Sequence, residues 1–337
     1  MSTSVQTQKR ILLIANKAWE ATPLMNVLLE PRACPSGFPW PNNLCPLEAW
    51  QTSSVAKSSS DVTNPRPRTI FSLKVPINGT NPQEVCTANV EVWCIQDWMS
   101  PSAHPSSSFE KTIVLPKIFN WSEDKKCKPR SPDFVVAFGT AGFPIVSSSY
   151  NGCVVIGANA FIYNAHKEDP NPQSPWDDSV VPRPIKPTLP RDFFGELDPG
   201  LLAQIESRLI VPPMCPAEKE ILIAAYNYTA VSAVNITNYD EYAWADPKAL
   251  EVFKSQDALN PAGSIETTHG IIRVQSDAPF MFVSGITDRE GAFSSFNMEV
   301  STRVYAQNFA CAHNAGVAAA WLLPRIANFL VNFKPKS

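Results

Sequence analysis

PDFVVAFGTAGFP, at residues 132–144, is the stretch of this chain that says most about its fold. Its first half is a continuous apolar run, which is typical of a strand covered on both faces in a mainly parallel sheet. The run ends in Gly139-Thr140-Ala141-Gly142. Because glycine has no Cβ, this segment can turn sharply and approach a ligand closely. Taken alone, such a segment is more often a plain tight turn, so its meaning depends on its neighbours.

Similar apolar runs, bounded by turn residues, recur on both sides of this stretch. They lie at residues 10–16, 68–75, 88–96, 152–158, 228–236 and 279–286. Apolar residues at helical spacing lie between and after these runs, at residues 19–30, 109–121, 198–210 and 296–333. Alternation of strand and helix predicts an α/β protein, a three-layer α/β/α sandwich with a central mixed, mainly parallel sheet.

The chain is long enough for one large α/β domain or for two domains. Its 337 residues are 44% apolar, and no stretch resembles a linker between two independent cores. We therefore expect a single domain over residues 1–337. Its 32 prolines are concentrated in residues 31–66 and 170–190, which lack apolar periodicity. We expect both to be long surface insertions that serve as lids or oligomer contacts, and disorder is an equally good interpretation of the first.

Composition excludes several classes of protein. The net charge is −3 and only 18% of residues are charged, so the chain lacks the broad positive field that a nucleic-acid partner requires. Apolar runs such as residues 315–324 are shorter than the roughly 20 residues that cross a bilayer, so we expect no membrane span. The first apolar run is likewise too short for a secretory signal.

The eight cysteines are scattered, without CxxC pairs or clusters of histidine and cysteine. This spacing does not suit a zinc site, so we expect no metal. Reduced thiols in a cytoplasmic protein are the simplest interpretation. We expect no cofactor either.

Three acids stand where the predicted strands give way to the next element. Glu20 follows the first strand, Glu266 opens a stretch with helical spacing, and Asp288 lies just beyond an apolar strand, where ligands bind in open α/β sheets. A protonated carboxyl there can donate to a departing base, and an ionised one can accept from sugar hydroxyls or polarise water. Structural alternatives are open as well, equally so for Glu266 and Asp288, and for Glu20 residue type alone favours the structural one. Glu20 and Glu266 could complement a helix dipole, and Asp288 could cap a turn.

In this order and spacing, the segments resemble the nucleoside phosphorylase/nucleosidase superfamily, most closely its methylthioadenosine/adenosylhomocysteine nucleosidase branch. That family has an acidic stretch after its first strand, a Gly-Ser-Ala-Gly-Gly turn, a Met-Glu pair and a strand ending in Ser-Asp. The counterparts here are Glu20, the segment Gly139-Thr140-Ala141-Gly142, the pair Ile265-Glu266 and the pair Thr287-Asp288. The resemblance covers most of residues 8–30 and 130–330.

The resemblance implies a division of labour in cleaving the bond between ribose and a purine base. Glu266 would bind the ribose 2′ and 3′ hydroxyls, and Asp288 would protonate the departing purine. Glu20 would activate the attacking water. Backbone groups of residues 139–142 would line the floor of the pocket. The implied substrate is a purine nucleoside or a 5′-substituted adenosine, and the implied assembly is a homo-oligomer, a dimer or larger.

The chain departs from the family pattern at two places. Ile265 replaces the methionine before the ribose-binding acid, which keeps apolar packing but alters one wall of the sugar site. Glu241 stands where the family often has a base-stacking aromatic, with Tyr239 and Tyr242 nearby. How the base is held, and whether it is a plain adenine, therefore stay open.

Phosphorolysis is the main alternative to hydrolysis, and it needs a site for a dianion. Lys17 is the only cation after the first strand, and Phe138 directly precedes Gly139, so an anionic Glu20 would repel phosphate and favour water. Hydroxyls at a helix N-terminus could nevertheless hold phosphate, and here these are Ser106, Ser107 and Ser108. A phosphate-dependent phosphorylase therefore remains open, as does a third class, a binding or sensor protein of the same fold without turnover.

Overall fold

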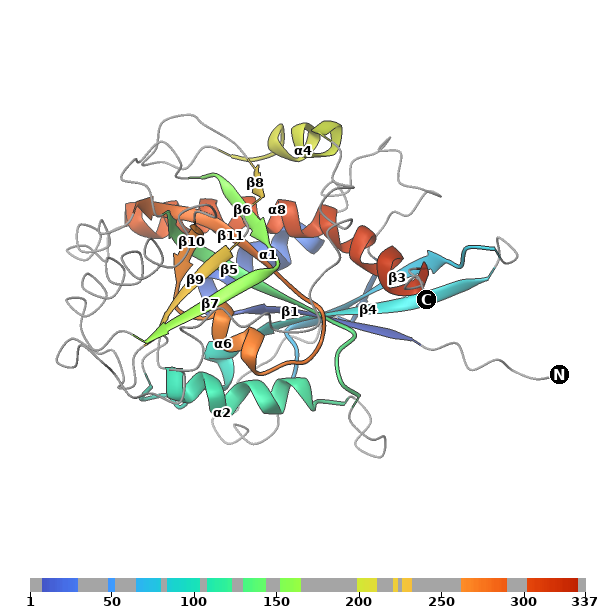
Figure 1. Ribbon diagram of the computed structural model, residues 1–337, viewed down its shortest axis with the longest axis horizontal. Coiled ribbons are helices and arrows are strands. Elements are labelled where there is room, and N and C mark those ends of the chain that lie inside the picture. Colours follow the sequence, from blue (N-terminus) through green and yellow to red (C-terminus); the bar gives the residue numbers. More distant parts are fainter. Residues whose placement is uncertain are drawn as a thin grey trace.

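The computed structural model describes residues 8–29, 48–51, 65–79, 84–103, 108–122, 130–143, 152–164, 199–210, 221–223, 226–231, 262–289 and 302–332. Within these residues a single mixed sheet of eleven strands runs through the molecule, with helices on both faces (Figure 1). The three-layer α/β/α architecture expected from the sequence is therefore confirmed.

Seven of the eleven strands overlap the predicted apolar runs, and four lie outside them. They are β1 (Lys9–Ala15), β2 (Glu48–Gln51), β3 (Thr69–Pro76), β4 (Val85–Cys94), β5 (Phe134–Phe143), β6 (Val154–Gly157), β7 (Asn159–Asn164), β8 (Ile221–Ile223), β9 (Tyr226–Val231), β10 (Ala262–Glu266) and β11 (Phe280–Arg289). Their order is β2-β3-β4-β1-β5-β10-β9-β7, while β11 pairs with β5 and β6, and β6 with β8. Strand β2 is an edge strand inside the first proline-rich insertion, and residues 170–190 lie outside the described part of the chain.

Strand β5 is the centre of this sheet. It runs parallel to β1 on one edge and parallel to β11 on the other. Beyond the end of β1, the antiparallel strand β10 pairs with β5, Ile265 lying opposite Gly142. Three strands therefore bring their ends together along β5.

Helices cover both faces of the sheet and divide the core into two clusters. They are α1 (Ala18–Leu29), η1 (Ile95–Trp98), α2 (Ser108–Phe119), α4 (Pro199–Glu206), α6 (His269–Val274) and α8 (Thr302–Asn332). Helices α1 and α8 cover one face and α2 and α6 the other (Figure 1). Side chains alternate along a strand, so Ile11 and Leu13 pack into the α1/α8 cluster and Leu12 and Ile14 into the α2/α6 cluster.

Two local predictions are wrong. The segment from Gly139 to Gly142 is not a turn but the second half of β5, because β11 pairs with β5 up to Phe143 and holds it extended. Glu266 does not open a helix. It is the last residue of β10, and α6 begins three residues later at His269.

The structure joins several short apolar runs into the single helix α8. By length and composition alone, this helix could cross a membrane. However, 72% of its most apolar window is buried inside the protein. A Cβ on Gly285 of β11 would lie 2.0 Å from the carbonyl oxygen of Cys311, so the helix backbone lies directly on the sheet. These are the contacts of a core helix.

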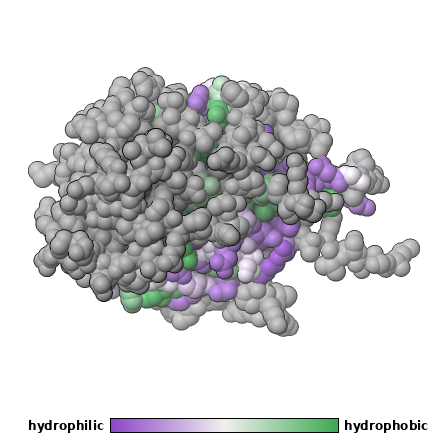
Figure 2. Space-filling view, viewed as in Figure 1, coloured by the Kyte–Doolittle hydropathy of each residue, from purple (hydrophilic) through white to green (hydrophobic). Residues whose placement is uncertain are grey.

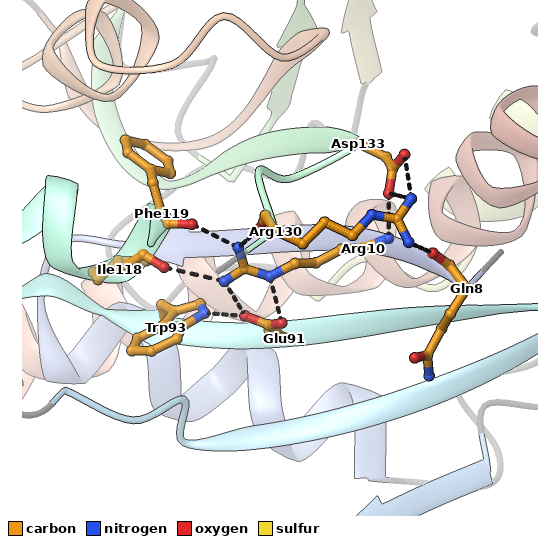
Figure 3. Close-up of polar contacts among 8 residues, drawn as sticks. All are labelled: Gln8, Arg10, Glu91, Trp93, Ile118, Phe119, Arg130 and Asp133. Carbon is orange, nitrogen blue, oxygen red and sulfur yellow. Dashed lines mark hydrogen bonds and ion pairs between the residues drawn. The ribbon is translucent and has the colours of Figure 1, made fainter. Parts of the chain in front are cut away.

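A buried ion pair at the amino end of β1 ties helix α2 to the sheet (Figure 3). The Arg10 guanidinium pairs with Glu91 of β4, with Nε 2.7 Å from Oε1 and an Nη 2.9 Å from Oε2. Trp93 also donates to Glu91, at 2.9 Å. The same guanidinium donates to the last carbonyls of α2, those of Ile118 and Phe119. The Arg10 guanidinium therefore neutralises the buried Glu91 carboxylate and also caps the C-terminus of α2.

Candidate active site

Glu20 lies in the first turn of α1, after β1, and the residue is 4% exposed. One carboxylate oxygen, Oε1, accepts from the backbone N–H and the hydroxyl of Thr140, at 2.9 and 3.0 Å. The other accepts from the backbone N–H of Lys17 at 2.9 Å. These three bonds hold the acid against the second half of β5. Its place at the start of a helix also favours negative charge there.

Gly139 is where β5 meets both α1 and α6. A Cβ at this position would lie 2.9 Å from Oε1 of Glu20 and 3.4 Å from Nε2 of His269. The space that any other side chain would fill is therefore bounded by a carboxylate and an imidazole. Glycine at this position lets the ends of the Glu20 and His269 side chains lie close to β5.

Glu266 lies at the end of β10 with 6% of its side chain exposed. Both of its carboxylate oxygens are 2.9 Å from the backbone nitrogen of His269, and it also accepts from the backbone N–H of Thr268. Glu266 is therefore not a first-turn acid, but it accepts from the backbone N–H groups at the start of α6. This does not exclude a ligand, because each carboxylate oxygen has two lone pairs.

His269, the first residue of α6, is only 2% exposed. Its ring stacks on Phe282 at a centroid distance of 6.0 Å. Nδ1 lies 3.9 Å from Oε1 of Glu266 and 3.5 Å from Oγ of Ser284. Since Nε2 faces Gly139 and Glu20, the imidazole lies between the two acids. Sequence reasoning gave this histidine no role, because a single histidine in an apolar segment carries no sign of its neighbours.

Lys111 of α2 lies beneath the loop that joins β10 to α6 and is completely buried. Its ammonium donates to the carbonyl of Thr267 at 2.8 Å, and to the hydroxyls of Thr267 and Thr268 at 3.3 and 2.9 Å. Burial lowers the pKa of Lys111 to about 7, and the Glu266 carboxylate opposes this shift. Sequence reasoning missed this lysine, since the pattern of its helix did not distinguish it from a surface cation.

The remaining predicted residues fall into two groups. Ile265 and Asp288 both pair with Gly142, so their backbones flank β5 on opposite edges. Thr287 is 8% exposed and donates to the carbonyl of Ala141 at 3.3 Å, where it fastens β11 to β5. The other predicted positions lie outside the described residues or have undescribed side chains: Ser106, Ser107, Ser108, Tyr239, Glu241, Tyr242 and the side chains of Ile265 and Asp288.

The described residues contain no cluster of three or more histidine, cysteine, aspartate or glutamate side chains that could hold a metal ion. The described part of the site brings together Glu20, Glu266, His269 and Lys111 near the second half of β5. Such a set can bind hydroxyl groups and transfer protons.

No protein-family model matches the chain, and no curated protein matches it. Solved structures match it over nearly its whole length. One from Borrelia burgdorferi B31, assigned as a 5′-methylthioadenosine/S-adenosylhomocysteine nucleosidase and bound to adenine, is 12% identical with a TM-score of 0.47, over 93% of this chain and 98% of its own.

The 5′-methylthioadenosine nucleosidase of Arabidopsis thaliana, in its apo form, is 12% identical with a TM-score of 0.46, over 97% of each chain. A futalosine hydrolase mutant of Helicobacter pylori strain 26695 is 8% identical with a TM-score of 0.41, over 94% of this chain and 98% of its own. Likeness of fold does not determine chemistry, so the activity depends on the side chains of the site.

Proposed function

We propose that this chain is a nucleosidase of the nucleoside phosphorylase/nucleosidase superfamily, near its methylthioadenosine/adenosylhomocysteine nucleosidase branch. It hydrolyses the N-glycosidic bond of a purine nucleoside or of a 5′-substituted adenosine. One observation carries the proposal. Two buried carboxylates, Glu20 and Glu266, come from distant parts of the chain and approach the same half of β5, on either side of His269.

The reaction needs a group for each charge that develops. Glu266 accepts hydrogen bonds from the ribose 2′ and 3′ hydroxyls and stabilises the positive charge on the sugar. Asp288, at the carboxyl end of β11, gives its proton to the base as the bond from C1′ to nitrogen breaks. Water forms the new bond to C1′ and loses one proton to the Glu20 carboxylate. The products are the free base and a ribosyl group with a hydroxyl at C1′.

The surroundings of Glu20 support hydrolysis rather than phosphorolysis. The backbone N–H and the hydroxyl of Thr140 are the donors that an anion would use at this strand, and both already bind Oε1 of Glu20. A phosphate dianion would have to displace a buried carboxylate that repels it. Water meets neither obstacle and can itself donate to the carboxylate.

Identity of the base is the less constrained part of the proposal. The proposal keeps four residues as ones that bind the substrate: Tyr239, Glu241, Tyr242 and Thr287. Backbone groups of residues 139–142 lie below the sugar in this proposal. The similar structures include an adenine complex and a 5′-methylthioadenosine nucleosidase. A suitable panel of test substrates is therefore adenosine, inosine, 5′-methylthioadenosine and S-adenosylhomocysteine.

Incubation of the purified chain with this panel, with and without phosphate, tests the proposal. We expect at least one nucleoside to release free base at a rate independent of phosphate, with free ribosyl product by chromatography. Release that requires phosphate would instead identify a phosphorylase. Binding without release under either condition would identify a sensor.

The proposal includes a homo-oligomer of two or more copies. Helix α2 exposes two large apolar side chains one turn apart, Phe109 at 64% and Ile113 at 40%. Figure 2 shows apolar surface over this helix. Exposed apolar surface of this kind supports an association between copies. Light scattering of the chain and of a variant with both positions changed to serine would measure it.

A further inference from the structure

The short loop that joins β10 to α6, Thr267 and Thr268, is held by two charged side chains from distant parts of the chain. The carboxylate of Glu266 accepts from the backbone N–H of Thr268 and from that of His269, the latter at 2.9 Å. The ammonium of Lys111 donates to the carbonyl of Thr267 at 2.8 Å and to the hydroxyl of Thr268 at 2.9 Å. The loop therefore connects a buried cation of α2 to the acid that ends β10.

The ammonium of Lys111 has as many acceptors as it has N–H groups. Besides these two oxygens, the hydroxyl of Thr267 lies 3.3 Å from Nζ, so three oxygens of the loop match its three donors. Burial disfavours the charged form and lowers the pKa of Lys111 to about 7, while Glu266 favours the charged form. An apolar side chain could fill the same space without this cost. A buried ion next to an acid of the candidate site is more typical of function than of packing.

Thr268 shows what the lysine changes at the start of α6. It is the N-cap residue of this helix, and threonine is a preferred cap because its hydroxyl can accept from N–H groups of the first turn. Here the hydroxyl makes no capping bond and accepts from Lys111 instead. The N–H of His269, the first residue of the helix, donates to Glu266. Lys111 thus leaves the start of the helix to the carboxylate.

We infer that Lys111 is a positioning residue of the proposed hydrolysis, which fixes the β10–α6 loop so that Glu266 holds its carboxylate toward the ribose hydroxyls. This inference rests on the proposed function, in which Glu266 accepts from the 2′ and 3′ hydroxyls. Each carboxylate oxygen has two lone pairs, so Glu266 can bind the loop and the ribose together. Without Lys111, the hydroxyl of Thr268 is released to cap α6, and the loop no longer fixes the direction of the carboxylate.

Preference for a ribonucleoside over its 2′-deoxy analogue measures this direction. The ratio of the two kcat/KM values does not change when less of the protein is folded, so a merely structural role leaves it unaltered. Each nucleoside of the panel that is hydrolysed is compared with its 2′-deoxy analogue, for example adenosine with 2′-deoxyadenosine. Glu266→Gln serves as the reference, because the proposed function requires it to lower the ratio.

We expect Lys111→Met to lower the ratio about fivefold or more, because the bonds that the 2′ hydroxyl makes to a charged group depend on exact geometry. Lys117→Met, an exposed position on the same helix, is the matched control and keeps the ratio of the parent. A Lys111→Met protein with the ratio of the parent, when Glu266→Gln lowers it, would overturn the inference and leave the proposed function intact. A parent that hydrolyses no nucleoside, or an unchanged ratio in Glu266→Gln, would refute the proposed roles and the inference with them.

A pair of variants at Thr268 tests the same link from the loop. Thr268→Val keeps the shape of the side chain but leaves one donor of the buried ammonium without its acceptor, whereas Thr268→Ser keeps the hydroxyl. We expect the valine variant to lower the ratio at least about twofold and the serine variant to keep it. If Lys111→Met does not fold, this pair decides, and equal ratios in its two members would overturn the inference.

Discussion

The three hydrogen bonds of Glu20 can be accepted together only by a carboxylate. In Glu20→Gln, the side-chain NH₂ group must face either the N–H of Lys17 or the two donors of Thr140. A buried donor then faces another donor, and at least one hydrogen bond is lost. We expect base release to fall about 100-fold or more, because the water also loses its proton acceptor. Stopped-time assays of base release measure this loss, and thermal unfolding measures the accompanying loss of stability.

Glu84→Gln is the control for this substitution, because Glu84 is exposed and precedes β4 at the end of the sheet away from the site. The control variant keeps its full activity. A Glu20→Gln protein that hydrolyses at the rate of the control would show that Glu20 has no part in the chemistry.

Buried Lys111 makes the stability of the protein depend on pH. Its pKa is about 7 in the folded chain, against an ordinary value of 10.5 in the unfolded chain. Between these values the unfolded state binds one proton more than the folded state, so the free energy of unfolding rises with pH, by at most about 1.4 kcal/mol per pH unit. Below about pH 7 both states are protonated, and the cost of burying the charge is fully present.

Lys111→Met removes this dependence. In urea unfolding at a series of pH values, we expect the stability of the parent to increase relative to the variant from about pH 7 upward. The exposed Lys74→Met serves as the control and should follow the parent at every pH. Parallel curves for the parent and Lys111→Met would contradict the prediction.

Helix α2 carries Lys111 near its start, and its other end is fastened by the Arg10–Glu91 pair (Figure 3). Arg10→Met leaves the 4%-exposed Glu91 without its cation and removes the guanidinium hydrogen bonds to the carbonyls of Ile118 and Phe119 at the end of α2. Breaking a buried ion pair in this way costs about 3–5 kcal/mol. We therefore expect Arg10→Met to lower the free energy of unfolding by about this amount, measured by urea denaturation.

A double variant distinguishes loss of the ion pair from loss of packing. Arg10→Met combined with Glu91→Leu removes both charges and fills the space with apolar atoms, so it should recover much of the stability lost in the single variant. A double variant less stable than Arg10→Met would mean that the hydrogen bonds to α2, rather than the uncompensated acid, account for the loss.

Ligand binding should stabilise the whole molecule, because the site draws on elements from both ends of the chain. A ligand at about 100 times its Kd adds about 2.7 kcal/mol to the free energy of unfolding. We expect adenine to raise the melting temperature by several degrees in a thermal scan, and phosphate at the same concentration to leave it unchanged. A shift with phosphate and none with adenine would favour the phosphorylase alternative.

Much of the order of strands and helices could be predicted from the sequence because it depends on short-range patterns, although β2, β7, β8 and β10 were not predicted. In β1, five consecutive apolar residues from Ile11 to Ala15 are each fully buried, and such a run indicates a strand covered on both faces wherever it occurs. The position of Glu20 was predicted for the same reason, since it follows such a run, whereas Asp288 was expected just beyond its strand and is the last residue but one of β11. Composition and the spacing of apolar residues were sufficient for the layers of the fold.

Only the tertiary structure decided what lies beside these acids. Pairing with β11 keeps residues 139–142 extended, and the antiparallel direction of β10 returns Glu266 and His269 to Gly139. Strand direction and register join residues far apart in the chain, and a single histidine or lysine carries no local sign of its partners. The sequence therefore determined the elements and the candidate acids, while long-range pairing decided that His269 and Lys111 join them, because burial and proximity are properties of the packed chain.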